Sequence, residues 1–164
     1  MEDYSFERLD AKHQNAVIAI FNYYIENSLA AYRDKIVENC FFENFVGDID
    51  KYPGYAILNS KKNVVGFCML EPLMPIDTFK EVAEITYFIH KDNTGMGIGT
   101  CALNKLIDDA RNLGVKKLVA NISSDNIGSI IFHIKHGFEE YGRLRKAGNK
   151  FGKYFDIIYM EKMI

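Results

Sequence analysis

Three glycines at alternate positions form the segment of this sequence that most clearly indicates chemistry. The segment reads Asn93-Thr94-Gly95-Met96-Gly97-Ile98-Gly99 and lies between an apolar run and a long helical pattern. Glycine lets the backbone turn tightly and approach a ligand without an intervening side chain. The N–H groups and the dipole at the start of a helix favour an anion. The segment therefore predicts a pyrophosphate site, although such glycines also form ordinary tight turns.

Two common phosphate sites are excluded by the neighbouring residues. The phosphate loop of nucleotide hydrolases requires Lys followed by Ser or Thr after its last glycine, whereas Thr100 and Cys101 follow Gly99. A dinucleotide-binding loop requires a wider glycine spacing and an acidic residue at the end of the next strand. Here the glycines alternate and that strand is expected to end at Asn121. A different phosphate-containing ligand is therefore expected.

Hydrophobic periodicity places this loop within a single mixed α/β domain spanning residues 1–164. Strands are expected at 4–9, 55–58, 64–70, 81–90, 116–121, 139–146 and 154–163. A first helix has Val17, Ile20, Phe21, Tyr24 and Ile25 on its apolar face, and a second is expected at 34–45. A third follows the glycine loop and ends at Gly114. The fourth, 126–136, is expected to bury Ile127, Ile130, Ile131 and Ile134.

Composition excludes several classes of function. The net charge of −2, with scattered Lys and Arg, gives no basic face for nucleic acid. No apolar run reaches the ~20 residues that span a bilayer, and residues 1–10 do not resemble a signal peptide. The three cysteines, Cys40, Cys68 and Cys101, are expected to be buried in a protein of the reducing cytoplasm. His133 and His136 lack further ligands nearby, so no metal site is expected.

The glycine loop, its helix and residues 126–138 together resemble the GCN5-related N-acetyltransferase (GNAT) superfamily. The signature of that family is Arg or Gln, two residues, Gly, any residue, then Gly or Ala. Gly97 and Gly99 fill the glycine places, while Thr94 stands where Arg or Gln is usual. The second motif of the family is matched by Asn126, Ser129, His133, Gly137 and Phe138. The resemblance covers nearly the whole chain and implies a central mixed sheet of about seven strands flanked by about four helices.

Within that superfamily the chain is most similar to the phosphinothricin and methionine-sulfone acetyltransferase group. Three stretches carry this likeness, at residues 82–87, 129–138 and 145–156, and the last usually has Trp where Tyr154 stands. The resemblance implies transfer of an acetyl group from acetyl-CoA to the primary amine of a small molecule, an amino acid or an analogue. It also implies a possible homodimer.

The same resemblance implies two catalytic residues. Glu84 is expected to remove a proton from the acceptor ammonium, and the alternative is an outward-facing carboxylate paired with a lysine such as Lys80. His133 occupies the place where many members have a tyrosine that protonates the leaving thiolate. A histidine is partly protonated near neutral pH, and the alternative for His133 is an ordinary surface residue.

The remaining expected site residues fall into two sets. The acetyl-CoA set consists of the strand residues Tyr87, Phe88 and Ile89, the loop residues Gly95, Met96, Gly97, Ile98, Gly99 and Thr100, and the helix residues Asn126 and Ser129. The acceptor set consists of Tyr32, Arg145, Lys150 and Tyr154, of which the two cations could bind an amino-acid carboxylate.

Alternatives remain open at this level. The acceptor could be a protein N-terminus or a lysine side chain rather than a small molecule. The chain could also be a CoA-binding module without activity, or a phosphate-binding domain for nucleotides. Competition between CoA and ATP would separate the last alternative from the others.

Overall fold

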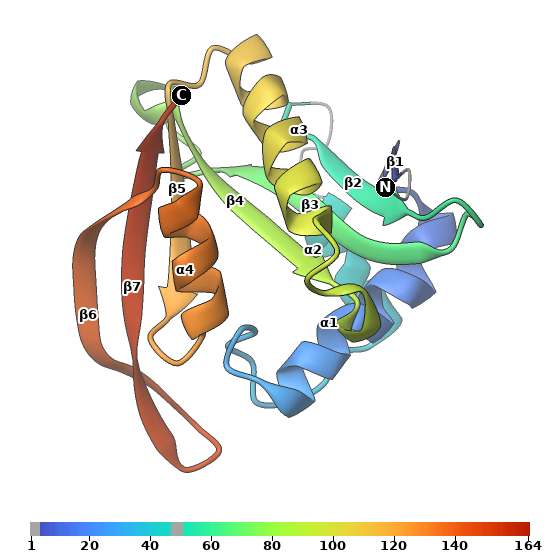
Figure 1. Ribbon diagram of the computed structural model, residues 1–164, viewed down its shortest axis with the longest axis horizontal. Helices are drawn as coiled ribbons and strands as arrows, with labels where there is room; N and C mark the ends of the chain where they lie inside the picture. Colours follow the sequence, from blue (N-terminus) through green and yellow to red (C-terminus); the bar gives the residue numbers. More distant parts are fainter. Residues whose placement is uncertain (1–3, 47–50) are drawn as a thin grey trace.

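The computed structural model describes residues 4–46 and 51–164, and a mixed sheet forms its centre (Figure 1). Its seven strands run in the order β1-β2-β3-β4-β5-β7-β6. Every neighbouring pair is antiparallel except β4 and β5, which are parallel. The strand bounds are β1 Ser5–Arg8, β2 Gly54–Leu58, β3 Val64–Pro72, β4 Val82–Ile89, β5 Lys117–Ser123, β6 Glu139–Lys150 and β7 Lys153–Met163. The expected mixed sheet is confirmed.

The helices are α1 Gln14–Asn27, α2 Glu43–Val46, α3 Ile98–Asn112 and α4 Ile127–Lys135, with short 3-10 turns at Ala11–His13, Asn39–Phe42, Asp77–Phe79 and Lys91–Asn93. The second helix is much shorter than the expected 34–45. Its first residues are held in another conformation, because the Asn22 side chain bonds both the backbone N–H (2.8 Å) and the backbone C=O (2.9 Å) of Val37. Both backbone groups are thereby withdrawn from a helix.

The two faces of the sheet are covered by different helices. Helix α1 buries Val17, Ile18, Ile20 and Ile25 against one face, where Phe67 and Met69 of β3 meet it. Helix α3 buries Ile98, Ala102, Leu103 and Leu106 against the other face. Side chains of a strand alternate between the faces, so β2, β3 and β4 contribute to both clusters.

The expected buried stripe of α4 is wrong. Ile127, Ile131 and Ile134 are exposed, while His133 is 3% exposed and Ile130 is half-buried. Helix α4 instead packs through its aromatic side chains. Phe132 lies against Gly99 of α3, and His133 lies between Tyr87 and Phe138. The burial of an aromatic histidine at this position turns the most apolar residues of the helix outward.

Strands β4 and β5 separate after a short paired stretch. The parallel pairing joins Val82–Glu84 to Lys117–Val119 and goes no further. Beyond Glu84 the two strands diverge (Figure 1), while β4 keeps its antiparallel partner β3 to Ile89. The β5-facing edge of 85–89 therefore has no strand partner, and a wedge-shaped opening interrupts the sheet.

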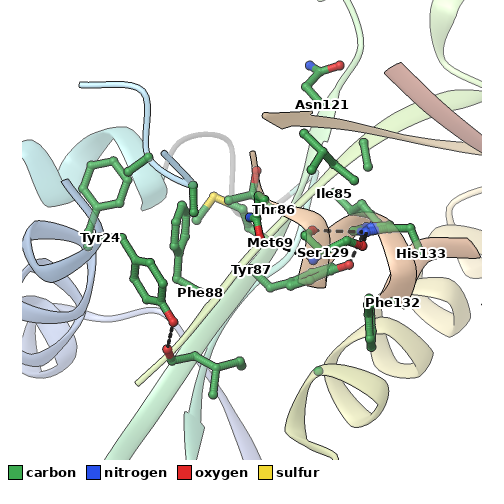
Figure 2. A pocket seen from close by; sticks show the side chains of 18 of the residues that line it. Tyr24, Met69, Ile85, Thr86, Tyr87, Phe88, Asn121, Ser129, Phe132 and His133 are labelled. Carbon is green, nitrogen blue, oxygen red and sulfur yellow. Dashed lines mark hydrogen bonds between the residues drawn. The ribbon is translucent and has the colours of Figure 1, made fainter. Parts of the chain in front are cut away.

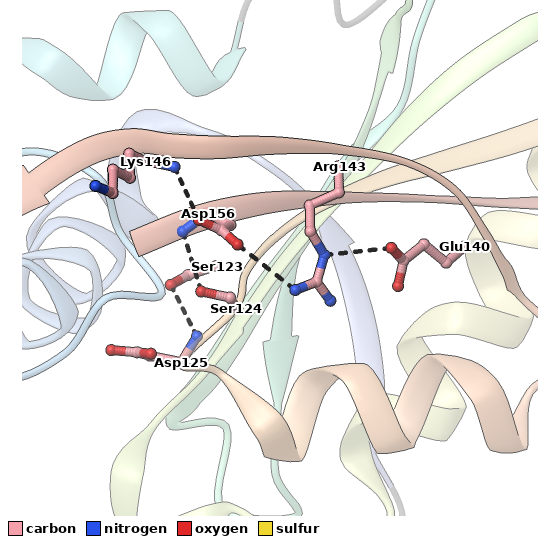
Figure 3. A network of polar contacts seen from close by, with 7 residues as sticks. All are labelled: Ser123, Ser124, Asp125, Glu140, Arg143, Lys146 and Asp156. Atoms are coloured by element: carbon pink, nitrogen blue, oxygen red, sulfur yellow. Dashed lines mark hydrogen bonds and ion pairs between the residues drawn. The ribbon is translucent and has the colours of Figure 1, made fainter. Parts of the chain in front are cut away.

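The C-terminal hairpin is tied to the start of α4 by Asp156 (Figure 3). Its carboxylate accepts from the backbone N–H of Lys146 at 2.8 Å and pairs with Arg143 at 3.5 Å. Its backbone bonds Ser124 in both directions. Lys146 has a φ of 49°, within a register shift between Leu144 and Gly148. β6 continues to Lys150, beyond its expected end at residue 146, and the turn lies at Phe151–Gly152.

Two further expectations concern cysteines and membranes. Cys68 is buried as expected, but Cys40 and Cys101 are exposed, so the expectation of burial is wrong for these two. None of the helices in residues 4–46 and 51–164 is long and apolar enough to cross a membrane.

Candidate active site

A cavity of about 1030 Å³ opens where β4 and β5 diverge. Its walls come from β3, β4, β5, the loop after α1, the glycine loop and α4. Figure 2 shows Thr86, Tyr87 and Phe88 of β4 crossing this space, with Ser129 and His133 of α4 on one side and Tyr24 of α1 on the other. The Tyr24 hydroxyl donates to the Ile89 carbonyl at 2.6 Å, which closes the far end of β4.

The glycine loop forms one end of the cavity. Gly95 and Gly97 have φ values of 77° and 83°, in the left-handed region that favours glycine, and Gly97 is the N-cap of α3. No side chain caps the helix, and the first intrahelical bond is that from the Cys101 N–H to the Gly97 carbonyl. The N–H groups of the first turn are thus available to an anion.

Gly99 has a different purpose from the other two glycines. A Cβ at this position would lie 3.3 Å from the Phe132 ring, so glycine permits the close approach of α4 to α3. The same contact is reinforced by Thr100 Oγ1 and His136 Nε2, which lie 3.1 Å apart. The loop and α4 therefore meet at one end of the cavity.

Most of the expected acetyl-CoA residues line this single cavity. They are Tyr87, Phe88, Ile89, Gly95, Gly97, Ile98, Gly99, Thr100, Asn126 and Ser129. Met96 does not line it and is 55% exposed. The side chain of Asn126 caps α4 by accepting from the Ser129 N–H at 3.3 Å. A helix start with free N–H groups, followed by an unpaired strand edge, fits a phosphate joined to an extended polar arm, as in CoA.

Glu84 lies where the two strands separate. Its Oε1 accepts from the Asn121 side-chain amide across the gap at 2.7 Å. Burial raises the pKa of Glu84, the charge of its cross-strand partner Glu71 raises it further, and the Asn121 hydrogen bond opposes both effects. The alternative pairing with a lysine is not found among the described residues. A carboxylate with a raised pKa in a cavity suits proton transfer.

Tyr32 closes the cavity beside Glu84. Its hydroxyl donates to the backbone carbonyl of Asn121 at 3.1 Å, and its ring stacks on Phe155 with centroids 5.7 Å apart. Burial raises the pKa of Tyr32 to about 12, with a further contribution from the Glu84 charge. The expected acceptor residue Tyr32 and the expected base Glu84 are thus brought together.

His133 is neutral at neutral pH. Its Nδ1 donates to the Ser129 carbonyl at 2.7 Å, which leaves Nε2 to accept from the Tyr87 hydroxyl at 2.5 Å (Figure 2). Burial lowers the pKa of His133 to about 4. Burial also raises the pKa of Tyr87. The expectation that His133 is partly protonated near pH 7 is therefore wrong. The wall of the cavity carries a neutral tyrosine–histidine pair instead.

The other three expected acceptor residues lie outside the cavity lining. Arg145 and Tyr154 are exposed on the C-terminal hairpin. Lys150 is 4% exposed, and its ammonium donates to the carbonyls of Ser28 (2.8 Å) and Ala31 (2.7 Å). Its cation is thus occupied by the chain itself.

Sequence analysis did not single out three polar residues of the cavity. Asn121 holds Glu84, Glu71 lies opposite Glu84 with the Thr86 hydroxyl 3.3 Å from its carboxylate, and Arg33 lines the wall next to Tyr32. The sequence does not indicate their place in the site, because each contacts a residue on another element. Thr94 also lines the cavity, and its hydroxyl donates to the Lys91 carbonyl at 3.0 Å.

Comparisons with known proteins agree with this geometry. The family profile described as "Acetyltransferase (GNAT) domain" matches residues 5–159. The chain is 29% identical over 150 residues to the L-amino acid N-acyltransferase MnaT of Escherichia coli (strain K12), covering 89% of this chain and 86% of that protein. The solved structure of yncA from Salmonella typhimurium with its cofactor acetyl-CoA superposes with a TM-score of 0.89 at 25% identity, over 98% and 94% of the chains. The ribosomal-protein-alanine N-acetyltransferase of Brucella melitensis gives a TM-score of 0.89 at 30% identity, over 98% and 99% of the chains.

Proposed function

The chain belongs to the GNAT family of acetyltransferases and uses acetyl-CoA, and from this premise we propose that its acceptor is the primary amine of an amino acid or a close analogue, such as phosphinothricin or methionine sulfone. The observation that carries the proposal is Glu84, a carboxylate with a raised pKa that lines the same cavity as the glycine loop, where the uncapped start of α3 is suited to an anion. The relative MnaT, named an L-amino acid N-acyltransferase, supports this acceptor class.

Acetyl transfer to an amine needs a base because the acceptor arrives largely protonated. Free α-amino groups titrate near ~8 and lysine amines near ~10.4. In our proposal Glu84 takes one proton from the ammonium, directly or through water, and the free amine attacks the thioester carbonyl carbon. The C–S bond then breaks without an acyl-enzyme. The N–H groups of Tyr87 and Ile89, which point to the unpaired strand edge, are suited to polarise the thioester oxygen.

The leaving sulfur requires a hydrogen-bond donor that is present at neutral pH. Sequence analysis assigned this role to His133, and we propose that His133 acts through Tyr87. In this structure the single Tyr87 O–H donates to His133 Nε2, and both groups are neutral. In our proposal this O–H turns to donate to the sulfur as negative charge develops there, while the packing of the His133 ring keeps the Tyr87 side chain in place. The sulfur then takes the second proton that the acceptor nitrogen loses as the amide forms, so that the products are the N-acetyl compound and CoA.

A closed acceptor end favours a small molecule over a protein. Tyr32 bridges from the loop after α1 to β5 and Phe155, and Lys150 fixes the same loop to the C-terminal hairpin. The similarity to a ribosomal-protein-alanine N-acetyltransferase favours the second candidate, acetylation of a protein N-terminus. The two candidates differ in the size of acceptor that the cavity admits.

The test is to incubate the purified protein with acetyl-CoA and a panel of amines and to measure acetylated product by mass spectrometry. Mass detection is preferable because a thiol-reactive dye would also modify the exposed Cys40 and Cys101. The panel holds phosphinothricin, methionine sulfone, common amino acids, polyamines and peptides beginning with alanine. Acetylated amino acids or analogues are the expected result. Acetylation of the peptides alone would replace the proposal with the second candidate.

We also propose a homodimer in the cytoplasm. β6 is an edge strand with Tyr141 and Leu144 each 52% exposed, and Ile131 and Ile134 of α4 add exposed apolar surface. Such apolar surface is typical of protein interfaces. Exposed free thiols at Cys40 and Cys101 suit a reducing compartment. Light scattering during gel filtration should give about twice the mass of 18.8 kDa, and Leu144→Lys should lower it. A monomeric mass for the unmodified protein would contradict the proposal.

A further inference from the structure

The proposed acceptor class creates a requirement that the expected residues do not meet. An amino acid brings a carboxylate into a cavity that already contains Glu84 and Glu71. A carboxylate that is taken out of water needs a cation or several donors. The sequence offered Arg145 and Lys150 for this purpose, but the first lies outside the cavity lining and the ammonium of the second is bound to two backbone carbonyls.

The cations that line the cavity lie at different ends. Among the described residues, the basic side chains of the lining are those of Arg33 and Lys135 and the imidazoles of His133 and His136. His136 contacts Thr100 in the first turn of α3, so the end of α4 with Lys135 and His136 adjoins the glycine loop. His133 is neutral at neutral pH. Arg33 is therefore the positively charged side chain of this lining that lies away from the glycine loop.

Arg33 lies on the wall that adjoins the proposed base. It directly follows Tyr32, whose hydroxyl bonds the carbonyl of Asn121, and the side chain of Asn121 bonds Glu84. The Arg33 guanidinium lies over the ring of Phe41, 4.5 Å from its centroid, and Phe41 also lines the cavity. A guanidinium stacked on an aromatic ring keeps its in-plane N–H groups free for a carboxylate.

The loop that carries Arg33 is fixed in place, and the arginine itself is not engaged in an ion pair. Lys150 clamps the preceding residues through two hydrogen bonds. The arginine ion pairs of residues 4–46 and 51–164 are those of Arg111 and Arg143. An exposed arginine with a fixed backbone and no carboxylate partner in the protein can bind the carboxylate of a ligand.

We propose that Arg33 binds the carboxylate of the acceptor, so that the cavity selects amines that carry a carboxylate over amines that lack one. This inference rests on the proposed function and adds the residue that reads the acid group. Lys150 is then a positioning residue, which acts through the loop that holds Arg33. Arg145 and Tyr154 have no part in binding the acceptor within one chain.

The test compares two acceptors of nearly the same shape, methionine sulfone and its carboxamide, of which only the first carries a carboxylate. Both are tested with the unmodified protein, with Arg33→Met and Arg33→Lys, and with the exposed-surface control Arg111→Met. Each variant is compared with the unmodified protein on the same acceptor, because this cancels the lower basicity of the amine in the carboxamide. Loss of a charge-assisted, bidentate contact should lower kcat/KM for methionine sulfone by about 10- to 100-fold in Arg33→Met. The value for the carboxamide and the KM for acetyl-CoA should change less than about twofold, and Arg33→Lys should recover part of the loss.

The outcomes separate this inference from the proposed function. If methionine sulfone is acetylated but Arg33→Met lowers kcat/KM for both acceptors equally, Arg33 does not read the carboxylate and only this inference is overturned. If no amino acid or analogue in the panel is acetylated, the proposed acceptor class is wrong and the inference is overturned with it. A fall caused by Arg111→Met of the same size as that caused by Arg33→Met would also overturn the inference.

Discussion

The side-chain amide of Asn121 donates to the Glu84 carboxylate at 2.7 Å, across the gap between two strands that have already separated. Glu84 stands at the last paired position of β4, and Asn121 lies two residues beyond its partner Val119 on β5. The hydrogen bond stabilises the charged form of Glu84, whereas burial and Glu71 favour the neutral form. The hydrogen bond thus fixes the orientation of the proposed base at the point where the two strands separate.

Replacement of Glu84 by Gln should reduce turnover most at low pH. The amide keeps the shape and can still accept from Asn121, but it cannot take a proton from the acceptor. A positioned base is worth roughly 10²–10⁴ in rate, and this loss should shrink above the acceptor pKa, where the free amine is already abundant. The measurement is kcat/KM between about pH 6 and pH 9.5. Glu81→Gln, at an exposed glutamate paired with Lys116, is the control. An equal loss at every pH would show that Glu84 does not act as the base.

Replacement of Asn121 by Leu should move the acidic limb of the pH–rate profile to higher pH. The hydrogen bond from Asn121 lowers the pKa of Glu84, so its removal lets burial and Glu71 raise that pKa further. Glu84 must be ionised to accept a proton, and a raised pKa leaves less of the ionised form at low pH. The measurement is the profile of kcat/KM with a single acceptor. An unchanged acidic limb, together with a uniformly lower rate, would mean that Asn121 only supports the fold.

The fold was largely predictable because it depends on local periodicity. Strands that form short apolar runs and helices with apolar residues three and four apart are visible in the sequence. The buried strand β2 and the third helix, with Ile98, Leu103 and Leu106, illustrate the two patterns. Helix 34–45 failed because Asn22, distant in sequence, holds the backbone of Val37. The prediction of the buried face of α4 was wrong because it relied on hydrophobicity, which favours isoleucine over histidine. In the structure Tyr87 and Phe138 pack against His133.

The site was predictable only where a family motif reports it. The glycine loop and Glu84 come from such motifs, and the structure places them in one cavity. Asn121, by contrast, is one polar residue at a strand end, and its partner lies 37 residues away. Lys150 contacts Ala31 across 119 residues of sequence. A cation bound to carbonyls and a cation bound to substrate are indistinguishable in a sequence.

The buried His133 should weaken the fold as the pH falls. Its pKa is about 4 in the folded protein, against 6.5 for an unperturbed histidine. Because the unfolded chain binds the proton first, stability contributed by the neutral form is present above pH 6.5 and is lost progressively between pH 6.5 and pH 4. The difference corresponds to about 3 kcal/mol. Urea unfolding at pH 7 and pH 4.5 should show a smaller loss for His133→Gln, which does not titrate, than for the unmodified protein. Equal losses would indicate that His133 is not held neutral.

The two kinds of glycine in the loop should respond differently to alanine. Gly97→Ala meets no atom within 4 Å but must keep a φ of 83°, which costs about 1–2 kcal/mol for an L-residue. Relief of that strain would turn the N–H groups at the start of α3 away from the proposed phosphate site. We expect a higher KM for acetyl-CoA and an unchanged KM for the acceptor.

Gly99→Ala instead places a Cβ 3.3 Å from the Phe132 ring, so α4 must shift from α3. Because α4 carries His133, which holds Tyr87, this variant should lower kcat and the melting temperature as well as acetyl-CoA affinity. Kinetics with each substrate varied in turn, combined with thermal unfolding, distinguish the two variants. Identical kinetic and thermal effects of the two substitutions would show that the loop acts only as a turn, with no separate anion-binding and helix-packing positions.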